Sequence, residues 1–198
     1  TLLPMADVVL DIHSGGKTLE FLPFCCAHRL PDRQQEEACV AAMQAFNAPY
    51  AMMLLEIDNA GMYDTAAEEM GKVFISTELG GGGTSSARTV AVAKRGVRNL
   101  LAHAGIVKGE LKQEPSIMLD MPGGDCFTFS ADEGLIEPCV DLGDRVRKDD
   151  LIAKVWATDR SGRRAAEYRA AMDGILAGRH FPGLVKAGDC IGVIATIA

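Results

Sequence analysis

The sequence predicts an α/β domain followed by a smaller β-rich domain. Up to about residue 103, short apolar runs that suit strands alternate with stretches of helical composition, which is the pattern of an α/β fold. From about residue 115, short apolar runs are instead separated by Gly, Pro and Asp, which is typical of small β folds. The polar residues 108–115 lie between these patterns, so we place the domains at residues 1–111 and 112–198.

Within the first domain, the strands are expected where the apolar runs are longest: residues 6–13, 50–57 and 72–79. The middle of the first run is continuously apolar, as in a buried sheet. Asp32 is a suitable N-cap for a helix that ends at 47–49 (N-A-P), and residues 65–70 have helical composition. Ser85 or Ser86 is expected to cap a long helix that stops just before Gly105.

Within the second domain, residues 134–156 and 174–194 look like two copies of one unit. Each contains a strand, a turn with Gly-Asp or Lys-Asp, and another strand. Two such units predict a small β-barrel or sandwich built from two similar halves.

Charge and cysteine content narrow the class of protein. A net charge of −7 and a pI of about 5.1 disfavour nucleic acid or an anionic membrane surface as partner. The first residues lack the basic and apolar regions of a secretory signal, and no apolar run approaches the roughly 20 residues that span a bilayer. The six cysteines form no C-x-x-C pair, as expected of reduced thiols. We therefore expect a cytoplasmic protein.

His13 is the first candidate site residue. It ends the first predicted strand and runs into a Ser-Gly-Gly turn, which is where open α/β sheets bind ligands. Neutral imidazole is a good zinc ligand. Asp11 lies on the same strand face as His13 and can place a negative charge beside a metal-binding imidazole. A satisfied core histidine beside a tight turn is the simpler interpretation, and position alone does not exclude it.

Glu78 is the second candidate. It ends another apolar strand and precedes four glycines, residues 80–83. A partly desolvated carboxylate at this edge of a sheet has a raised pKa, which suits a general base. The alternatives are a solvated Glu in a flexible loop and a phosphate-binding loop, although no Gly-Lys-Ser/Thr ending is present. If the strands are parallel, Glu78 and His13 lie at the same end of the sheet.

The remaining polar residues receive simpler interpretations. His28 is expected in a loop, and Glu68 and Glu69 on a solvated helix face. Tyr63, near the start of a helix, either lines a cleft or packs against neighbours. Ser14 has no evident partners for a catalytic triad.

Taken in order, D-I-H-S-G-G at 11–16 and the stretch 61–83 (G-M-Y-D through E-L-G-G-G-G) resemble the succinylglutamate desuccinylase/aspartoacylase family. This family belongs to the zinc carboxypeptidase-like superfamily, and the likeness runs over essentially the whole chain. Within it, E-F-L-P at 20–23 and F-N-A-P-Y at 46–50 are most similar to deacetylases of acetylated diaminobutyrate in bacterial ectoine breakdown. The resemblance implies a mixed α/β sheet followed by a C-terminal β half-barrel of biotinyl/lipoyl-like type.

The resemblance also implies roles for single residues. His13 matches the second zinc histidine of the family, and Glu78 matches its catalytic glutamate, which takes a proton from the attacking water and passes it to the leaving amine. Tyr63 lies near the position of a substrate-contacting tyrosine. The implied cofactor is one Zn²⁺ per complete active site.

One part of the family pattern is missing. The other two zinc ligands come from an upstream His-x-x-Glu motif, which this sequence lacks, as it lacks the upstream substrate-binding Arg and Asn-Arg segment. We therefore expect a C-terminal piece of a longer zinc-dependent amidohydrolase, inactive alone, with the remaining ligands upstream. The alternative is a non-catalytic binding or assembly module that has lost the zinc site.

The substrate is expected to be a small N-acyl amino acid, and homo-oligomers are possible partners. No arginine occurs from Tyr63 to Glu78, whereas Glu68 and Glu69 do, which favours a substrate with a free ammonium over one with an anionic acyl group. The β-rich domain has no Lys at its Met172-Asp173-Gly174 turn, so we interpret it as structural and not as a cofactor carrier.

Overall fold

The computed structural model describes residues 2–55, 61–159 and 162–198. The chain divides into two compact units that alternate along the sequence. The first unit comprises Thr1–Ser14, Pro23–Leu79 and Ser85–Asp120, and the second comprises Gly15–Leu22, Gly80–Thr84 and Met121–Ala198. The division into domains at residues 1–111 and 112–198, which was made from the sequence, stays a prediction. None of the described helices is long and apolar enough to cross a membrane.

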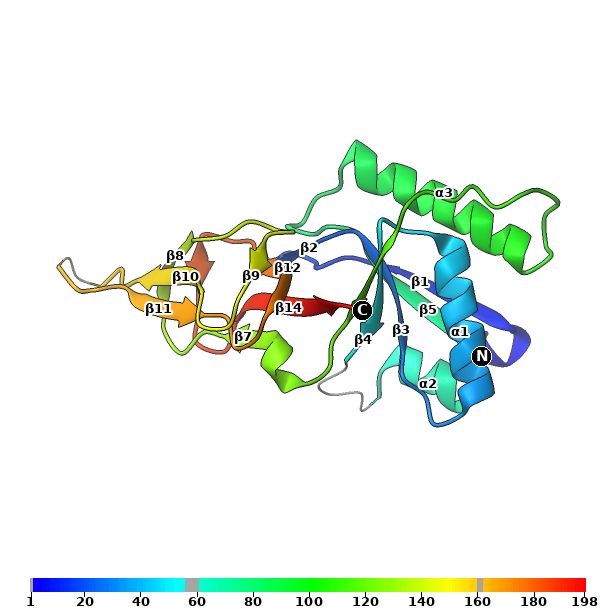
Figure 1. Cartoon of the computed structure of the whole chain (residues 1–198), viewed down its shortest axis with the longest axis horizontal. Coiled ribbons are helices and arrows are strands. Elements are labelled where there is room, and N and C mark those ends of the chain that lie inside the picture. The colour runs from blue at the N-terminus through cyan, green and yellow to red at the C-terminus, as the bar shows by residue number, and fades with distance from the viewer. Residues whose placement is uncertain (1, 56–60, 160–161) are drawn as a thin grey trace. The chain divides into compact units, whose positions relative to one another are not determined.

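The first unit is built on a mixed sheet (Figure 1). Its strands lie side by side in the following order: β1 (Val8–His13), β5 (Val73–Glu78), β3 (Phe24–His28), β4 (Tyr50–Leu54) and β6 (Ile117–Asp120). The β1–β5, β3–β4 and β4–β6 pairs are parallel, and only the β3–β5 pair among these is antiparallel. The mixed α/β fold that the sequence predicts is therefore confirmed.

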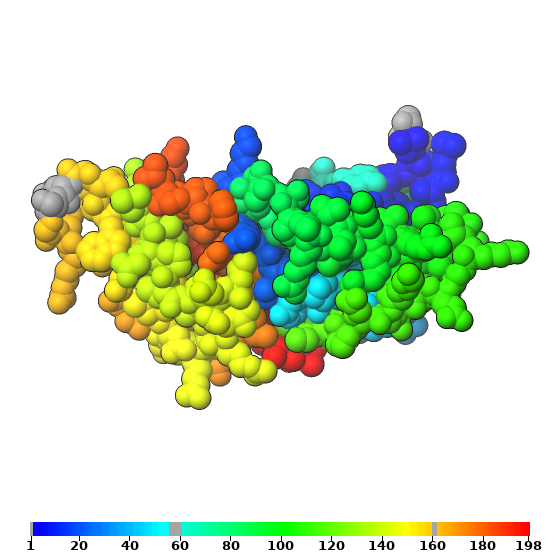
Figure 2. All heavy atoms as spheres, turned by 90° about the horizontal axis from the view of Figure 1, so that it is seen from above, coloured from blue at the N-terminus to red at the C-terminus, as the bar shows by residue number. Residues whose placement is uncertain are grey.

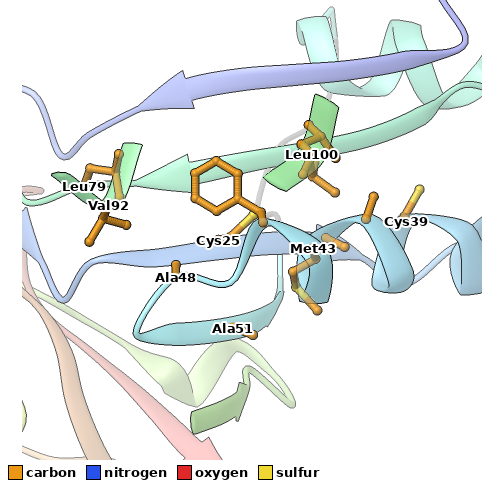
Figure 3. Close-up of a cluster of buried hydrophobic side chains, with 12 residues drawn as sticks. Cys25, Cys39, Met43, Ala48, Ala51, Leu79, Val92 and Leu100 are labelled. Carbon is orange, nitrogen blue, oxygen red and sulfur yellow. The ribbon is translucent and has the colours of Figure 1, made fainter. Parts of the chain in front are cut away.

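Two helices, α1 (Arg33–Phe46) and α3 (Ala87–His103), cover one face of this sheet. Apolar side chains of both helices pack with those of the strands in one buried cluster. Figure 3 labels eight of its members: Cys25, Cys39, Met43, Ala48, Ala51, Leu79, Val92 and Leu100. The helices approach closely at Gly96, where an added Cβ would lie 2.2 Å from the Phe46 ring. The outer side of α3, in green, lies on the molecular surface in Figure 2.

The short helix α2 (Tyr63–Glu69) packs on the other face of the sheet, where Val9, Ala67 and Phe74 form a small cluster. A 3₁₀ turn at Leu3–Met5 precedes β1, and Leu3 packs against the same cluster. This second face carries the polar side chains described below, because residues alternate between the two faces along each strand.

The predicted helix starts are confirmed. The Asp32 carboxylate accepts hydrogen bonds from the backbone N–H groups of Gln34 and Gln35 at the start of α1. Ser86 and Thr89 form a reciprocal capping box at the start of α3. These caps satisfy N–H groups that have no partner within the helix, so local sequence fixes where both helices begin.

The sequence analysis expected no strand in residues 19–28, where the structure forms two: β2 (Leu19–Phe21) and β3. All five residues of β3 are buried, including His28, which had been expected in a loop. Pro23 interrupts the apolar run and hides the strand. Of the strand expected at 50–57, Tyr50–Leu54 is observed, and residues 56–57 lie outside the described part.

The second unit contains two sheets. In the first, β7 (Phe127–Phe129), β14 (Cys190–Ile197), β12 (Gly174–His180) and β2 are neighbours, and β9 (Arg145–Val146) also pairs with β12. The second sheet has the order β11 (Ala166–Arg169), β10 (Leu151–Trp156), β8 (Gly134–Pro138) and β13 (Leu184–Val185). A 3₁₀ turn at Gly124–Cys126 precedes β7. The β-rich character predicted for the C-terminal part is confirmed, whereas its likeness to biotinyl/lipoyl domains stays a prediction.

The two copies recognised in the sequence have the same strand pattern. In the first copy, the short strand β9 lies in the sequence between two longer strands, β8 and β10. In the second copy, the short strand β13 lies in the same way between β12 and β14. The short strand of each copy pairs with the first strand of the other, because β9 pairs with β12 and β13 pairs with β8. The unit is therefore built from two interlocked halves with a shared pattern.

Candidate active site

His13 and Glu78 end neighbouring parallel strands and are direct partners in the register. The register of β1 and β5 runs from Val8 opposite Val73 to His13 opposite Glu78. Partners in a parallel pair project from the same face, so the two side chains lie side by side at one edge of the sheet. The sequence predicted this convergence on the condition that the strands are parallel, and they are.

Thr77 locks this register from the opposite face. Its hydroxyl accepts a hydrogen bond from the backbone N–H of His13 at 3.0 Å and donates one to the His13 carbonyl at 3.2 Å. The carbonyl also accepts from the N–H of Leu79 at 3.0 Å. Thr77 is fully buried, so these bonds are shielded from water. Sequence reasoning missed Thr77, because a threonine in an apolar strand carries no signal of this role.

The imidazole of His13 is accessible, with its side chain 61% exposed. Its Nδ1 lies 3.5 Å from Oδ2 of Asp11, which shares this face of β1 as the sequence predicted. A carboxylate beside one ring nitrogen orients the imidazole and leaves the other nitrogen, Nε2, directed elsewhere. This arrangement suits a histidine that binds a metal through Nε2.

Glu78 occupies a much less polar position than His13. Burial raises the pKa of its carboxyl from 4.5 to about 8, and the nearby negative charge of Asp11 adds to the effect. Its Oε2 atom is buried and has no hydrogen-bond partner among the described residues. A carboxyl with these properties exchanges a proton near neutral pH, which is what a general acid–base group requires.

Cys26 lies beside this pair on the same face, opposite Ser76 in the β3–β5 register. Its Sγ lies 3.0 Å from the Ser76 hydroxyl. Burial raises the pKa of the Cys26 thiol to about 12, and the charges of Glu78 and Asp64 raise it further. The thiol is therefore neutral near pH 7 and a poor nucleophile.

Tyr63 begins α2 and is about half exposed. Its ring packs edge-on against Phe74 of β5, with the ring centroids 5.7 Å apart. Residues 56–60, which precede α2, lie outside the described part. Tyr63 and Glu78 are thus carried by elements that pack on each other, α2 and β5.

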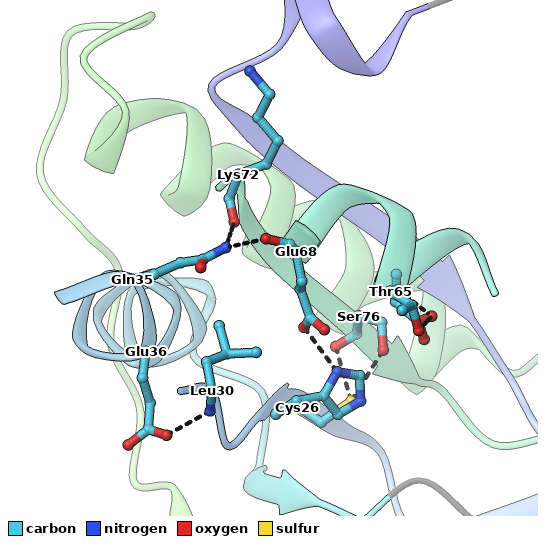
Figure 4. A network of polar contacts seen from close by, with 10 residues as sticks. Cys26, Leu30, Gln35, Glu36, Thr65, Glu68, Lys72 and Ser76 are labelled. Carbon is cyan, nitrogen blue, oxygen red and sulfur yellow. Dashed lines mark hydrogen bonds and ion pairs between the residues drawn. The ribbon is translucent and has the colours of Figure 1, made fainter. Parts of the chain in front are cut away.

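Glu68 of α2, labelled in Figure 4, forms a buried hydrogen-bonded pair with His28 of β3, so the interpretation of Glu68 as solvated was wrong. Glu68 Oε1 lies 2.8 Å from Nδ1 of His28, and the two side chains are only 10% and 8% exposed. The Gln35 amide donates to the carbonyls of Glu68 and Lys72, which fixes the end of α2. No pattern in the sequence pairs residues 28 and 68.

The metal-binding capacity of the site is partial. Within residues 2–55, 61–159 and 162–198, no group of three or more His, Cys, Asp or Glu side chains could hold a metal ion. His28 and His180 are buried, and both face partners within the fold: His28 faces Glu68, and His180 Nε2 faces the Leu184 carbonyl at 3.0 Å. His103 is the last residue of α3. His13 is the histidine that the fold leaves open beside Glu78.

Comparison with known proteins places this site in context. A family model described as the succinylglutamate desuccinylase/aspartoacylase catalytic domain matches residues 1–104. An N-alpha-acetyl-L-2,4-diaminobutyric acid deacetylase from Halomonas elongata is 49% identical over 198 residues, which cover 99% of this chain and 58% of that protein.

Solved structures agree with this match. The product-bound ectoine utilization protein EutE (DoeB) from Ruegeria pomeroyi is 59% identical with a TM-score of 0.97, covering 99% of this chain and 60% of that one. A succinylglutamate desuccinylase from Silicibacter sp. is also 59% identical, with a TM-score of 0.95, covering 100% of this chain and 60% of that one. The chain therefore spans about three-fifths of the length of these relatives.

Proposed function

This chain belongs to the succinylglutamate desuccinylase/aspartoacylase family, and from that premise we propose that it carries part of the active site of a zinc-dependent deacylase. The reaction is the hydrolysis of the amide bond of an N-acyl amino acid. One observation supports this most directly: His13 and Glu78 are register partners on one face of the sheet. The His13 side chain is exposed to solvent, whereas the Glu78 carboxyl is buried and has a pKa of about 8.

In this proposal, Glu78 moves the proton. As a carboxylate it takes a proton from the water whose oxygen forms a bond to the amide carbonyl carbon. The protonated carboxyl then gives this proton to the amine nitrogen as the C–N bond breaks, which leaves a carboxylic acid and an amine. The raised pKa of Glu78 suits both steps, because a group with a pKa near the working pH accepts and donates with similar ease.

His13 would hold the zinc ion through Nε2, while Asp11 keeps the ring oriented. Zinc supplies Lewis acidity that polarises the carbonyl and acidifies water. A catalytic zinc site uses about three protein ligands. His13 fits one of them, and the residues that the structure describes offer no further cluster, so the other ligands would come from elsewhere in the protein.

The proposed substrate is N-acetyl-diaminobutyrate, as the name of the similar Halomonas protein suggests. The Glu68 carboxylate is paired with His28, so it does not offer the free negative charge that the sequence analysis expected near the substrate. Among the described residues, Asp11 lies close enough to Glu78 to influence its pKa, and Asp64 lies close enough to Cys26 to influence the pKa of that thiol. These carboxylates favour a substrate with a free ammonium group.

The alternative function is a non-catalytic binding or assembly module. It is favoured by the observation that the described residues offer no complete metal site. The two functions differ in what the natively produced protein contains: an enzyme contains about one zinc per active site, whereas the module contains none.

The test begins with the intact mass and zinc content of the natively produced protein, followed by its rate of N-acetyl-diaminobutyrate deacetylation. Glu78→Gln should lower kcat by at least about 10²-fold, the typical contribution of a general acid–base group. Glu69→Gln, on the exposed side of α2, is the matched control and should leave the rate unchanged. Full activity of Glu78→Gln would contradict the proposal.

A further inference from the structure

The backbone segments that follow His13 and Glu78 are bonded to each other. We call residues 15–16 and 80–83 the glycine loops. The N–H of Gly15 donates to the carbonyl of Gly80 at 3.1 Å, and the N–H of Gly83 donates to the carbonyl of Gly16 at 2.6 Å. Both loops belong to the second compact unit, although the strands that lead into them belong to the first.

The glycine loops are packed too tightly for side chains at three positions. A Cβ at Gly15 would lie 2.4 Å from the carbonyl oxygen of Leu19. A Cβ at Gly81 would lie 2.0 Å from the carbonyl oxygen of Leu19, and a Cβ at Gly82 would lie 2.7 Å from the ring of Phe181. Gly82 also donates its N–H to the Leu19 carbonyl at 3.0 Å and has a φ of 66°, which favours glycine. The four-glycine run is therefore held by packing and backbone hydrogen bonds, which favours an ordered loop.

Phe181 is held in place by the sheet from which it emerges. It directly follows β12, which pairs with β2 so that His180 lies opposite Leu19. The N–H of Phe181 donates to the carbonyl of Thr18 at 2.8 Å, which extends this pairing by one residue. The ring is thus anchored to the segment that also contacts Gly81 and Gly82.

The carboxyl of Glu78 depends on this backbone for its position. Its buried Oε2 has no hydrogen-bond partner among the described residues. Glu78 ends β5, where it is the register partner of His13 and of Phe24, and its main chain continues directly into residues 79–83. A small shift of this main chain moves the carboxyl relative to His13.

We propose that Phe181 is a positioning residue for Glu78: its ring closes against Gly82 and fixes the main chain that carries the carboxyl. Phe181 acts through the main chain of residues 79–83 and not through contact with the reacting atoms. The effect on rate rests on the proposed function, because it requires Glu78 to be the acid–base group. The effect of Phe181 on the order of the glycine loops is independent of the proposed function.

The test compares two glycines with nearly the same φ. Gly82 and Gly83 have φ values of 66° and 69°, so alanine strains both backbones similarly. They differ in surroundings, because a Cβ at Gly83 meets only Lys17 Cγ at an ordinary 3.6 Å. In the natively produced protein, Gly82→Ala should lower kcat by about 10²-fold with little change in KM, the size expected for a misplaced catalytic group. Gly83→Ala should keep kcat within a few-fold of the wild type.

Rescue separates positioning from general damage. Removing the ring makes room for the new methyl group, so the double variant Gly82→Ala/Phe181→Ala should recover kcat by about tenfold over Gly82→Ala. The single variant Phe181→Ala should lower kcat with KM unchanged. Equal losses for Gly82→Ala and Gly83→Ala, or no recovery in the double variant, would overturn the proposal.

Amide hydrogen exchange provides a readout that does not need activity. Phe181→Ala should speed exchange at residues 79–83 by at least about tenfold while α1 stays protected, because the loops lose their packing. Unchanged exchange would overturn the proposal even if kcat fell. If Glu78→Gln proves fully active, the proposed function fails, whereas the exchange result still decides whether Phe181 fixes the loops.

Discussion

At the scale of single residues, Glu78 is a source of instability that the proposed chemistry requires. Its folded-state pKa of about 8 lies above the ordinary 4.5, so the folded protein keeps a proton that the unfolded chain has lost. The contribution of Glu78 to stability is therefore full below pH 4.5 and falls as the pH rises to about 8. Burial of the carboxyl, which makes it a useful base, is the cause of this cost.

Glu78→Gln should therefore stabilise the metal-free protein at alkaline pH. Gln has no charge to bury, so the free energy of unfolding should rise by on the order of 3 kcal/mol at pH 8.5 and change little at pH 4.5. Urea unfolding at both pH values measures this difference. Glu69→Gln, on the exposed side of α2, should show no such dependence, and an equal effect at both pH values would contradict the assignment.

Thr77 contributes at the same scale by holding the backbone of His13. Thr77→Val keeps the shape of the side chain but leaves the His13 N–H without its acceptor, which should cost about 1–3 kcal/mol of stability. Thr77→Ser keeps the hydroxyl and is the matched control. Exchange of the His13 amide should accelerate in the valine variant and stay slow in the serine variant; the same exchange rate in both would show that the hydroxyl does not hold the strand end.

At the scale of elements, the sequence predicts those whose signals are local. Caps at Asp32 and Ser86 start the two long helices as expected. The apolar runs that end in His13 and Glu78 are strands, and they are parallel. The paired halves of the β-rich unit were visible because the same pattern of strands and turns occurs twice in the sequence.

The elements that escaped prediction depend on contacts between distant residues. The strand β3 is buried on both faces, so it shows no alternation, and Pro23 hides where it begins. Glu68 reads as part of a polar helix face, because only the fold reveals that His28 lies opposite it. The glycine loops look flexible in sequence, whereas Leu19 and Phe181 hold them.

The hydrogen-bonded pair of Glu68 and His28 should determine how firmly α2 is held. This helix is short, and its N-cap residue, Met62, makes no side-chain cap bond. Glu68→Ala removes this partner of a buried imidazole, so the free energy of unfolding should fall by about 1–3 kcal/mol. Exchange of the amides in α2 should accelerate as well. Glu69→Ala, one residue further along α2, is the control; equal losses in both variants would mean that helix propensity and not the pair explains the effect.

At the scale of the whole molecule, we propose that the chain contains the acid–base group of the site, Glu78, and one of its zinc ligands, His13. It spans about three-fifths of the length of the similar proteins, and no complete metal cluster occurs in its described part. The family likeness could be stated from the sequence because its two motifs are continuous stretches, residues 11–16 and 61–83. The contact of Phe181 with Gly82 became visible only in the structure, since it joins residues 99 positions apart.

This partial site predicts how the 198-residue chain responds to zinc. His13, with Asp11 beside its Nδ1 atom, is expected to bind zinc weakly, because a catalytic zinc site needs about three protein ligands. Zinc at about 10 µM should therefore leave Tm unchanged, since a ligand stabilises a protein only when its concentration exceeds Kd. Thermal unfolding with and without zinc, in the wild type and in His13→Ala, measures this. Tight binding of one zinc per chain, lost in His13→Ala but kept in His103→Ala, would show that the chain completes the metal site by itself and that ligands beside His13 remain to be found.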